Sequence, residues 1–183
     1  MGKIKTEFAE GFPGLCVITP TVYRDARGSF SEVYNGRDLA QAGLQYSFVQ
    51  ENLIRSFYGT LRGMHFQRTA PQAKLIRVIS GRMYDVAVDL RKESPSYGKW
   101  FGIELSEENA LQLLIPRGFA HGCLTLSNEA VCAYLCDAYY APGDEGGFMW
   151  NDPAIDIRWP ELRSDSALPV LSDKDRRWPA LQL

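Results

Sequence analysis

The sequence predicts an all-β protein, a sandwich or barrel of many short strands. Three observations support this fold class. Runs of β-branched, aromatic and alternating residues recur along the chain, turn residues separate them, and little of the chain has a helical pattern. Many strands with little helix are typical of sandwiches and barrels, and a small closed barrel can hold one ligand among its inward-facing side chains.

The expected strands follow one another along the chain and are separated by turn signals. The strands are Val17–Val22, Phe48–Ile54, Lys74–Ile79, Met83–Leu90, Gly102–Leu105, Gln112–Ile115 and Val131–Tyr140. The turn signals are Asp25–Gly28, Ser80–Gly81, Ser94–Pro95, Ser127–Asn128 and Ala141–Asp144.

Helical patterns are few and short. A helix is expected at about Asn35–Ala42, with Asn35 or Asp38 as its capping residue. Ser106 and Asn109 are expected to begin and close a small turn. The polar C-terminal stretch Ser164–Trp178 is expected to form a helix or an ordered tail.

Length and composition limit the possible partners. With 183 residues, the chain is expected to form a single domain over residues 1–183 with a substantial core. Apolar residues make up 45% of the chain and the net charge is −2, without a basic block, so no nucleic-acid partner is expected. No apolar run approaches the roughly 20 residues that span a bilayer, so no membrane partner is expected.

Cysteine usage predicts a reducing compartment. Cys16, Cys123, Cys132 and Cys136 are scattered without the spacing of a zinc site or a disulfide framework. No signal peptide precedes them, so reduced thiols in the cytoplasm are expected.

The two histidines are the first candidates for chemistry. His65 lies in Leu61–Gln67 and His121 in Ile115–Gly122, and glycine and arginine flank both. Histidine is the side chain whose unperturbed pKa lies near neutral pH, so proton chemistry in a strand-built pocket is one interpretation. Two packed or surface histidines are the other.

Alternation along strands selects further candidates, because side chains two residues apart share a face. Gln50 and Asn52 share one, where they either bind a polar ligand or satisfy backbone groups. Tyr134 and Tyr140 share another if no bulge intervenes, as proton donor and stacking platform or as ordinary core-edge residues. Lys74 opens an apolar strand and either points at developing negative charge or reaches solvent.

Metal-dependent and nucleophilic chemistry have less support. Metal sites in β-barrels typically use a His-x-His pair, which this sequence lacks, so no metal is expected. There is no Gly-x-Ser-x-Gly, and Cys123, two residues from His121, gives one weak nucleophile pair.

An ordered set of motifs resembles the dTDP-4-dehydrorhamnose 3,5-epimerase family. The resemblance runs from about Gly11 to Asp175. Single motifs are weak, but their order and spacing together are specific. The motifs are Asp25–Glu32, Gln50–Asn52, Leu61–Gln67, Asp85–Arg91 with Ser94–Gly98, Ile115–Gly122, Tyr139–Pro142 and Trp150–Pro153.

The resemblance implies a cupin-type jelly roll with a few short peripheral helices, a homodimer with shared strands, and no metal or cofactor. The substrate would be dTDP-4-dehydro-6-deoxy-D-glucose and the product dTDP-4-dehydro-L-rhamnose, a precursor of surface polysaccharides. The C4 ketone acidifies C3 and C5, so a base and an acid on opposite faces can invert both centres through an enolate.

The resemblance also implies residue roles. His65 would be the base, with Asp175, or alternatively Asp173, as its carboxylate partner. Tyr134 would be the acid, and Lys74 would support the enolate oxygen. Tyr140 would stack on the thymine. The other residues implied in substrate binding are Arg27, Glu32, Gln50, Asn52, Arg62, His121, Glu145 and Lys174.

Two departures from the family pattern stand beside the pocket motifs. Ser29-Phe30 replaces the usual Phe-Phe, and Cys123 follows His121-Gly122 where phenylalanine is usual. These changes leave open the nucleotide and the number of inverted centres. The alternatives are an epimerase acting at C3 only or C5 only, a non-catalytic nucleotide-sugar binding module, and a metal-dependent oxygenase or isomerase.

Overall fold

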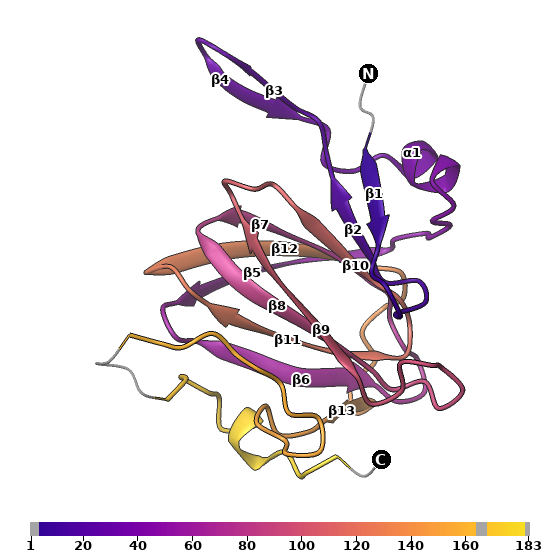
Figure 1. The fold of residues 1–183 in the computed structure, drawn as a ribbon, viewed down its shortest axis with the longest axis vertical. Helices are drawn as coiled ribbons and strands as arrows, with labels where there is room; N and C mark the ends of the chain where they lie inside the picture. Colours follow the sequence, from indigo (N-terminus) through magenta and orange to yellow (C-terminus); the bar gives the residue numbers. More distant parts are fainter. Residues whose placement is uncertain (1–3, 164–167, 182–183) are drawn as a thin grey trace.

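Two antiparallel sheets form the body of the protein in a computed structural model, which describes residues 4–163 and 168–181 (Figure 1). The six-stranded sheet has the order β1 (Lys5–Phe8), β2 (Cys16–Thr19), β10 (Gln112–Ile115), β7 (Lys74–Ser80), β12 (Glu129–Cys136) and β5 (Gln50–Phe57). The five-stranded sheet has the order β13 (Glu145–Gly147), β6 (Leu61–Gln67), β11 (Phe119–Thr125), β8 (Arg82–Asp89) and β9 (Trp100–Ser106). The predicted all-β jelly roll is confirmed.

Three small elements lie outside these sheets. The hairpin of β3 (Val22–Asp25) and β4 (Gly28–Ser31) is a separate two-stranded sheet that projects from the body (Figure 1). Helix α1 spans Gly36–Gln41, and a 3-10 helix spans Asp175–Arg177. No helix among the described residues is both long and apolar enough to cross a bilayer.

Alternating side chains build three apolar layers. The layer between the sheets includes Ile76 and Leu113 from one sheet and Met83 and Leu105 from the other. The outer face of the five-stranded sheet is covered by the chain after β13, which lies beneath β6 in Figure 1. The outer face of the six-stranded sheet is covered at one end by α1 and the residues that follow it, through Leu39. The two sheets therefore pack on each other through the middle layer, and each carries a further apolar layer on its outer face.

Local sequence signals account for several elements. The Asn35 side chain accepts hydrogen bonds from the backbone N–H groups of Arg37 and Asp38, so Asn35, one of the two predicted capping residues, is the N-cap of α1. The Ser106–Asn109 turn also forms as predicted, because each side chain accepts the other residue's backbone N–H, at 3.0 and 3.1 Å.

Several predicted boundaries are wrong. The expected strand Val17–Val22 divides at Pro20, which has no N–H for a ladder, and Val22 starts β3 instead. The expected strand Val131–Tyr140 ends at Cys136, because both antiparallel partner strands begin opposite this residue, at Gln50 and Lys74. The residue pattern alone did not predict strands β6 and β11, since glycines interrupt their apolar pattern, although the family resemblance marked Leu61–Gln67, the span of β6, as a strand.

The C-terminal prediction is partly met. Of the expected stretch Ser164–Trp178, residues 164–167 lie outside the described residues. The rest is an ordered segment with one 3-10 turn, and Thr60 forms a parallel bridge with Val170. This bridge brings the end of the chain alongside the start of β6.

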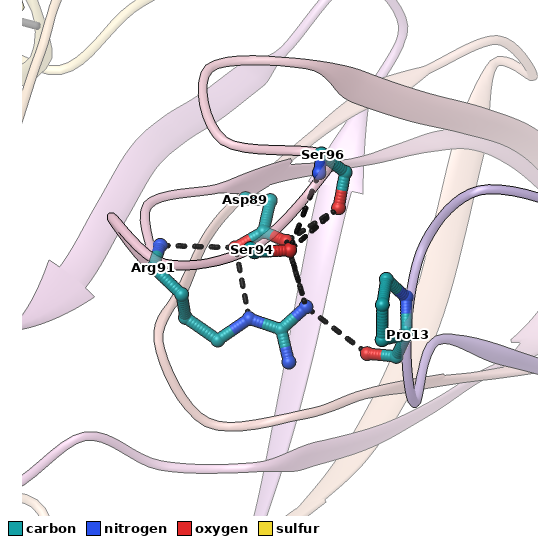
Figure 2. Close-up of polar contacts among 5 residues, drawn as sticks. All are labelled: Pro13, Asp89, Arg91, Ser94 and Ser96. Atoms are coloured by element: carbon teal, nitrogen blue, oxygen red, sulfur yellow. Dashed lines mark hydrogen bonds and ion pairs between the residues drawn. The ribbon is translucent and has the colours of Figure 1, made fainter.

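A buried carboxylate fixes the loop after β8 (Figure 2). Asp89 is fully buried and accepts hydrogen bonds from Ser94 and Ser96, both at 2.6 Å, and from the backbone and guanidinium of Arg91 at 2.7–2.9 Å. Arg91 also donates to the carbonyl of Pro13 at 3.0 Å. Burial alone would raise the pKa of Asp89, but these hydrogen bonds outweigh it and lower the pKa to about 2.

Replacing this carboxylate should weaken the fold in a pH-dependent way. Because its pKa falls on folding, ionised Asp89 stabilises the fold above the ordinary pKa near ~4, and this contribution is lost as the pH falls through about 2. We expect Asp89→Asn to lower the free energy of unfolding at pH 7 by about 2 kcal/mol in urea titrations, with a difference that shrinks below about pH 4. Glu93→Gln, an exposed acid in the same loop, is the control. Equal stabilities of Asp89→Asn and wild type at pH 7 would contradict this account.

Candidate active site

A cavity of about 620 Å³ lies between the sheets and brings together most of the predicted site residues. The predicted residues that line it are Gln50, Asn52, Arg62, His65, Lys74, His121, Tyr134, Tyr140, Glu145, Lys174 and Asp175. Arg27 and Glu32 do not line it. Both sheets and the C-terminal segment therefore contribute to one site.

The six-stranded wall follows regular alternation over the residues that line the cavity. On β7, Lys74 has the same parity as Ile76 of the inner core, and on β12, Tyr134 has the same parity as Cys132. On β5, Gln50 and Asn52 share the inward face, as the alternation predicted. Regular strands thus place the amides, the lysine and the phenol on one wall.

The five-stranded wall departs from alternation at one point. His121 pairs with His65, but Cys123 pairs with Arg62, so β6 holds one extra residue between these pairs. Arg62 and His65 consequently both face the cavity although they are three residues apart. Gly63 makes this possible, because a Cβ there would lie 2.6 Å from the Cα of Gly122.

His65 is held by a carboxylate from the end of the chain. Its Nε2 lies 2.5 Å from Oδ1 of Asp175, which is only 4% exposed. Burial would raise the pKa of Asp175, but the hydrogen bond and charge of His65, with the hydroxyl of Ser172, lower it, so the carboxylate stays ionised. An ionised carboxylate fixes the proton on Nε2 and leaves Nδ1 as the nitrogen that can accept one.

This geometry decides between the two candidate carboxylates. Asp173 is exposed, and its backbone carbonyl accepts a hydrogen bond from Arg177. Asp175 begins the 3-10 turn, and its backbone N–H donates to Ser172 at 3.1 Å. The turn therefore directs residue 175, and not residue 173, toward His65.

The opposite wall carries a protonated phenol and a buried amine. Burial is the main cause that raises the pKa of Tyr134, to about 12, so its hydroxyl keeps its proton at neutral pH. Burial of the Lys74 amine lowers its pKa, although neighbouring Cys136, Asp85 and Glu145 oppose the shift. Tyr134 can therefore act as an acid, and Lys74 can donate a hydrogen bond to an oxyanion.

A second histidine–carboxylate pair lies beside the first. Nε2 of His121 is 3.0 Å from both oxygens of Asp85, which is 1% exposed. Sequence reasoning did not select Asp85 as a site residue. The available signal was an acid between the apolar residues of β8, since an acid so placed is buried only when it has a partner.

The rim of the cavity carries further predicted residues. Glu145 and Lys174 form an ion pair at 2.7 Å. Arg62 donates through Nε to Ser56 at 3.1 Å. Tyr140 lies after the end of β12, so strand parity does not place it, yet it still lines the cavity.

Arg27 and Glu32 lie on or beside the projecting hairpin. The guanidinium of Arg27 pairs with Asp25 at 2.6 Å, and Glu32 accepts a hydrogen bond from Asn35 at 2.8 Å. The expectation that these side chains join the others is therefore not met within one chain. Arg27 lies in the turn of the β3–β4 hairpin, which projects away from the body (Figure 1), and Glu32 directly follows that hairpin.

Two alternatives remained from the sequence, a Cys123–His121 nucleophile pair and a metal site. Cys123 and His121 both line the cavity, but burial raises the pKa of the Cys123 thiol well above its ordinary value, which disfavours the nucleophilic thiolate. In residues 4–163 and 168–181, no group of three or more His, Cys, Asp or Glu side chains could hold a metal ion.

Comparison with known proteins identifies the family. A family model described as dTDP-4-dehydrorhamnose 3,5-epimerase matches residues 9–182. This chain belongs to that family. A member from Methanothermobacter thermautotrophicus is 48% identical over 92% of this chain and 90% of its own length. The predicted enzyme class, an isomerase, is confirmed.

Solved members of the family have the same fold. The Bacillus anthracis epimerase, with TDP and PPi bound, has a TM-score of 0.91 at 43% identity, covering 97% of this chain and 99% of that one. RmlC from Legionella pneumophila, in complex with dTDP-4-keto-L-rhamnose, has a TM-score of 0.89 at 38% identity, covering 98% of this chain and all of that one.

Proposed function

We propose that this epimerase converts dTDP-4-dehydro-6-deoxy-D-glucose to dTDP-4-dehydro-L-rhamnose by inverting C3 and C5, without metal or cofactor. One observation carries the proposal. The His65–Asp175 pair and the protonated Tyr134 line a single cavity from opposite sheets. Inversion needs a base on one face of the sugar and an acid on the other, and a binding module needs neither.

Each inversion would proceed in two steps. Nδ1 of His65 takes the proton from the carbon beside the ketone, and the electron pair of that C–H bond moves onto the ketone oxygen. Lys74 donates a hydrogen bond to the resulting enolate oxygen, which disperses its charge. Tyr134 then returns a proton to the carbon from the opposite face, and solvent restores both residues.

The remaining cavity residues would bind the nucleotide. Arg62 suits the diphosphate, because a guanidinium donates two parallel hydrogen bonds to a phosphate. Tyr140 would stack on the thymine and His121, oriented by Asp85, would contact the substrate. Gln50, Asn52, Glu145 and Lys174 would complete this subsite from its rim.

Arg27 and Glu32 would serve the cavity of a second copy of the chain in a homodimer. The hairpin exposes Tyr23 and Phe30, which are 48% and 70% exposed. The outer face of edge strand β5 exposes Leu53 and Phe57, both 66%. Exposed apolar groups on a projecting hairpin and on an edge strand are typical of a surface that another copy covers.

We place the enzyme in the cytoplasm. Its four cysteines are all free and buried, which suits a reducing compartment, and its proposed substrate is a nucleotide-linked sugar.

The reaction can be tested by solvent exchange. Incubated in heavy water with dTDP-4-dehydro-6-deoxy-D-glucose, the wild type should incorporate deuterium at C3 and C5 by NMR, with or without a chelator. His65→Asn should lose exchange by at least about 100-fold, the lower end for a general base. Tyr134→Phe should still remove protons but form product about 100-fold more slowly. Tyr139→Phe, a rim tyrosine outside the cavity lining, is the control.

Other exchange patterns would contradict the proposal. Exchange at only C3 or only C5 would identify an epimerase acting at one centre. Absence of exchange in the wild type would favour a binding module or another substrate. Normal exchange by His65→Asn, or a normal product yield from Tyr134→Phe, would mean that the base or the acid lies elsewhere.

Shared sites in a homodimer can be tested by mixing inactive subunits. His65→Asn and Arg27→Ala should each be nearly inactive alone. Co-expressed in equal amounts, they should recover about a quarter of the wild-type activity, because half the dimers are mixed and one of their two sites is intact. No recovery in purified mixed dimers would mean that Arg27 acts within its own chain, and a monomer by light scattering would contradict the dimer.

A further inference from the structure

The segment between β12 and β13 crosses from one sheet to the other at the cavity rim. It carries two neighbouring tyrosines. Tyr139 is 71% exposed, whereas Tyr140 is 48% exposed and lines the cavity. The segment belongs to neither sheet, so its position depends on hydrogen bonds from outside its own backbone.

Gln67, at the end of β6, supplies two of these bonds. Its Oε1 accepts the N–H of Ala141 at 2.9 Å, and its Nε2 donates to the carbonyl of Ala141 at 3.2 Å. The side-chain amide thus pairs with one backbone residue as a neighbouring strand would. Gln67 is 7% exposed, and its amide is occupied at both ends.

Two more glutamines bind the same segment. Gln50 lies at the start of β5 in the six-stranded sheet, and Gln72 lies just before β7 of that sheet. Oε1 of Gln50 accepts the N–H of Tyr140 at 2.9 Å, while its Nε2 donates to Asn52 at 3.1 Å. Nε2 of Gln72 donates to the carbonyl of Ala138 at 2.8 Å. Three side-chain amides therefore bind three backbone residues around Tyr140.

Carboxylates fix both ends of the segment. Asp137 accepts the N–H of Ala73 at 2.7 Å. Asp144 accepts the N–H and hydroxyl of Thr69 and the N–H of Ala70, at 2.7–3.0 Å. Both ends of the segment are thus held by contacts within the protein itself.

We propose that Gln50, Gln67 and Gln72 form a clamp that sets nucleotide affinity by holding Tyr140 in its binding position. The inference rests on the proposed function and concerns the part of the cavity that would bind the nucleotide. Gln67 is a positioning residue, because both ends of its amide already have partners within the protein. A wall fixed in advance spares the nucleotide the entropic cost of ordering it, so the clamp acts on binding and not on proton transfer.

A double-mutant cycle on dTDP binding tests the clamp. Gln67→Leu should weaken dTDP binding about 10-fold by calorimetry. Part of the binding free energy of dTDP would then be used to order the segment between β12 and β13. Tyr140→Ala should weaken it at least as much. The double variant should bind no more than twofold weaker than Tyr140→Ala, because Gln67 acts through Tyr140. Tyr139→Ala is the matched control and should bind dTDP as the wild type does.

Two further readouts separate positioning from general damage. Gln67→Leu should raise KM for the dTDP-sugar far more than it lowers kcat. Hydrogen exchange at the amides of Tyr140 and Ala141 should accelerate in this variant, while β7 keeps its protection. If Gln67→Leu fails to fold, Gln72→Leu tests the same coupling through Ala138.

The contradicting results are distinct from a failure of the proposed function. Additive losses in the double variant, or unchanged dTDP affinity in Gln67→Leu, would overturn the clamp while leaving the epimerase proposal intact. A wild type that binds no dTDP would overturn the proposed function itself.

Discussion

The hydrogen bond between His65 and Asp175 is the interaction on which the site depends. It joins two residues 110 positions apart, one on β6 and one near the end of the chain. The backbone N–H of Leu61 donates to the carbonyl of Val170 at 3.0 Å, and the ring of Trp178 lies 6.2 Å from that of His65 in an edge-on arrangement. The C-terminal segment therefore supplies the carboxylate partner of the proposed base, which the two sheets alone would leave without one.

The two sheets contribute in different ways. The six-stranded sheet offers a regular wall, where alternation places Lys74 and Tyr134 among core residues, and burial keeps the phenol protonated. The five-stranded sheet offers an irregular wall, where one extra residue in β6 turns both Arg62 and His65 inward. A base on one sheet and an acid on the other is the arrangement that inversion across a sugar ring requires.

Sequence patterns predicted the regular parts of this structure. Period-two alternation located Gln50 and Asn52 because β5 has no bulge, and Asn35 marked the start of α1 because a cap is a local signal. The side-by-side positions of Arg62 and His65 could not follow from alternation, since the extra residue in β6 breaks it. Asp85 and Asp175 acquire their partners only through tertiary contacts, and only the family resemblance pointed to Asp175. Arg27 and Glu32 lie away from the cavity because the hairpin that carries Arg27 and ends just before Glu32 leaves the body of the chain.

The most direct test of the account is the turnover number of Asp175→Asn on dTDP-4-dehydro-6-deoxy-D-glucose, measured beside Asp173→Asn. An asparagine in place of Asp175 would leave the shape of the site intact but could not hold His65 in the same tautomer or stabilise its imidazolium. We predict a fall in kcat of about 100-fold or more for Asp175→Asn, by analogy with other His–carboxylate pairs, and a change below about twofold for the exposed Asp173→Asn. Equal turnover by Asp175→Asn and wild type would contradict it.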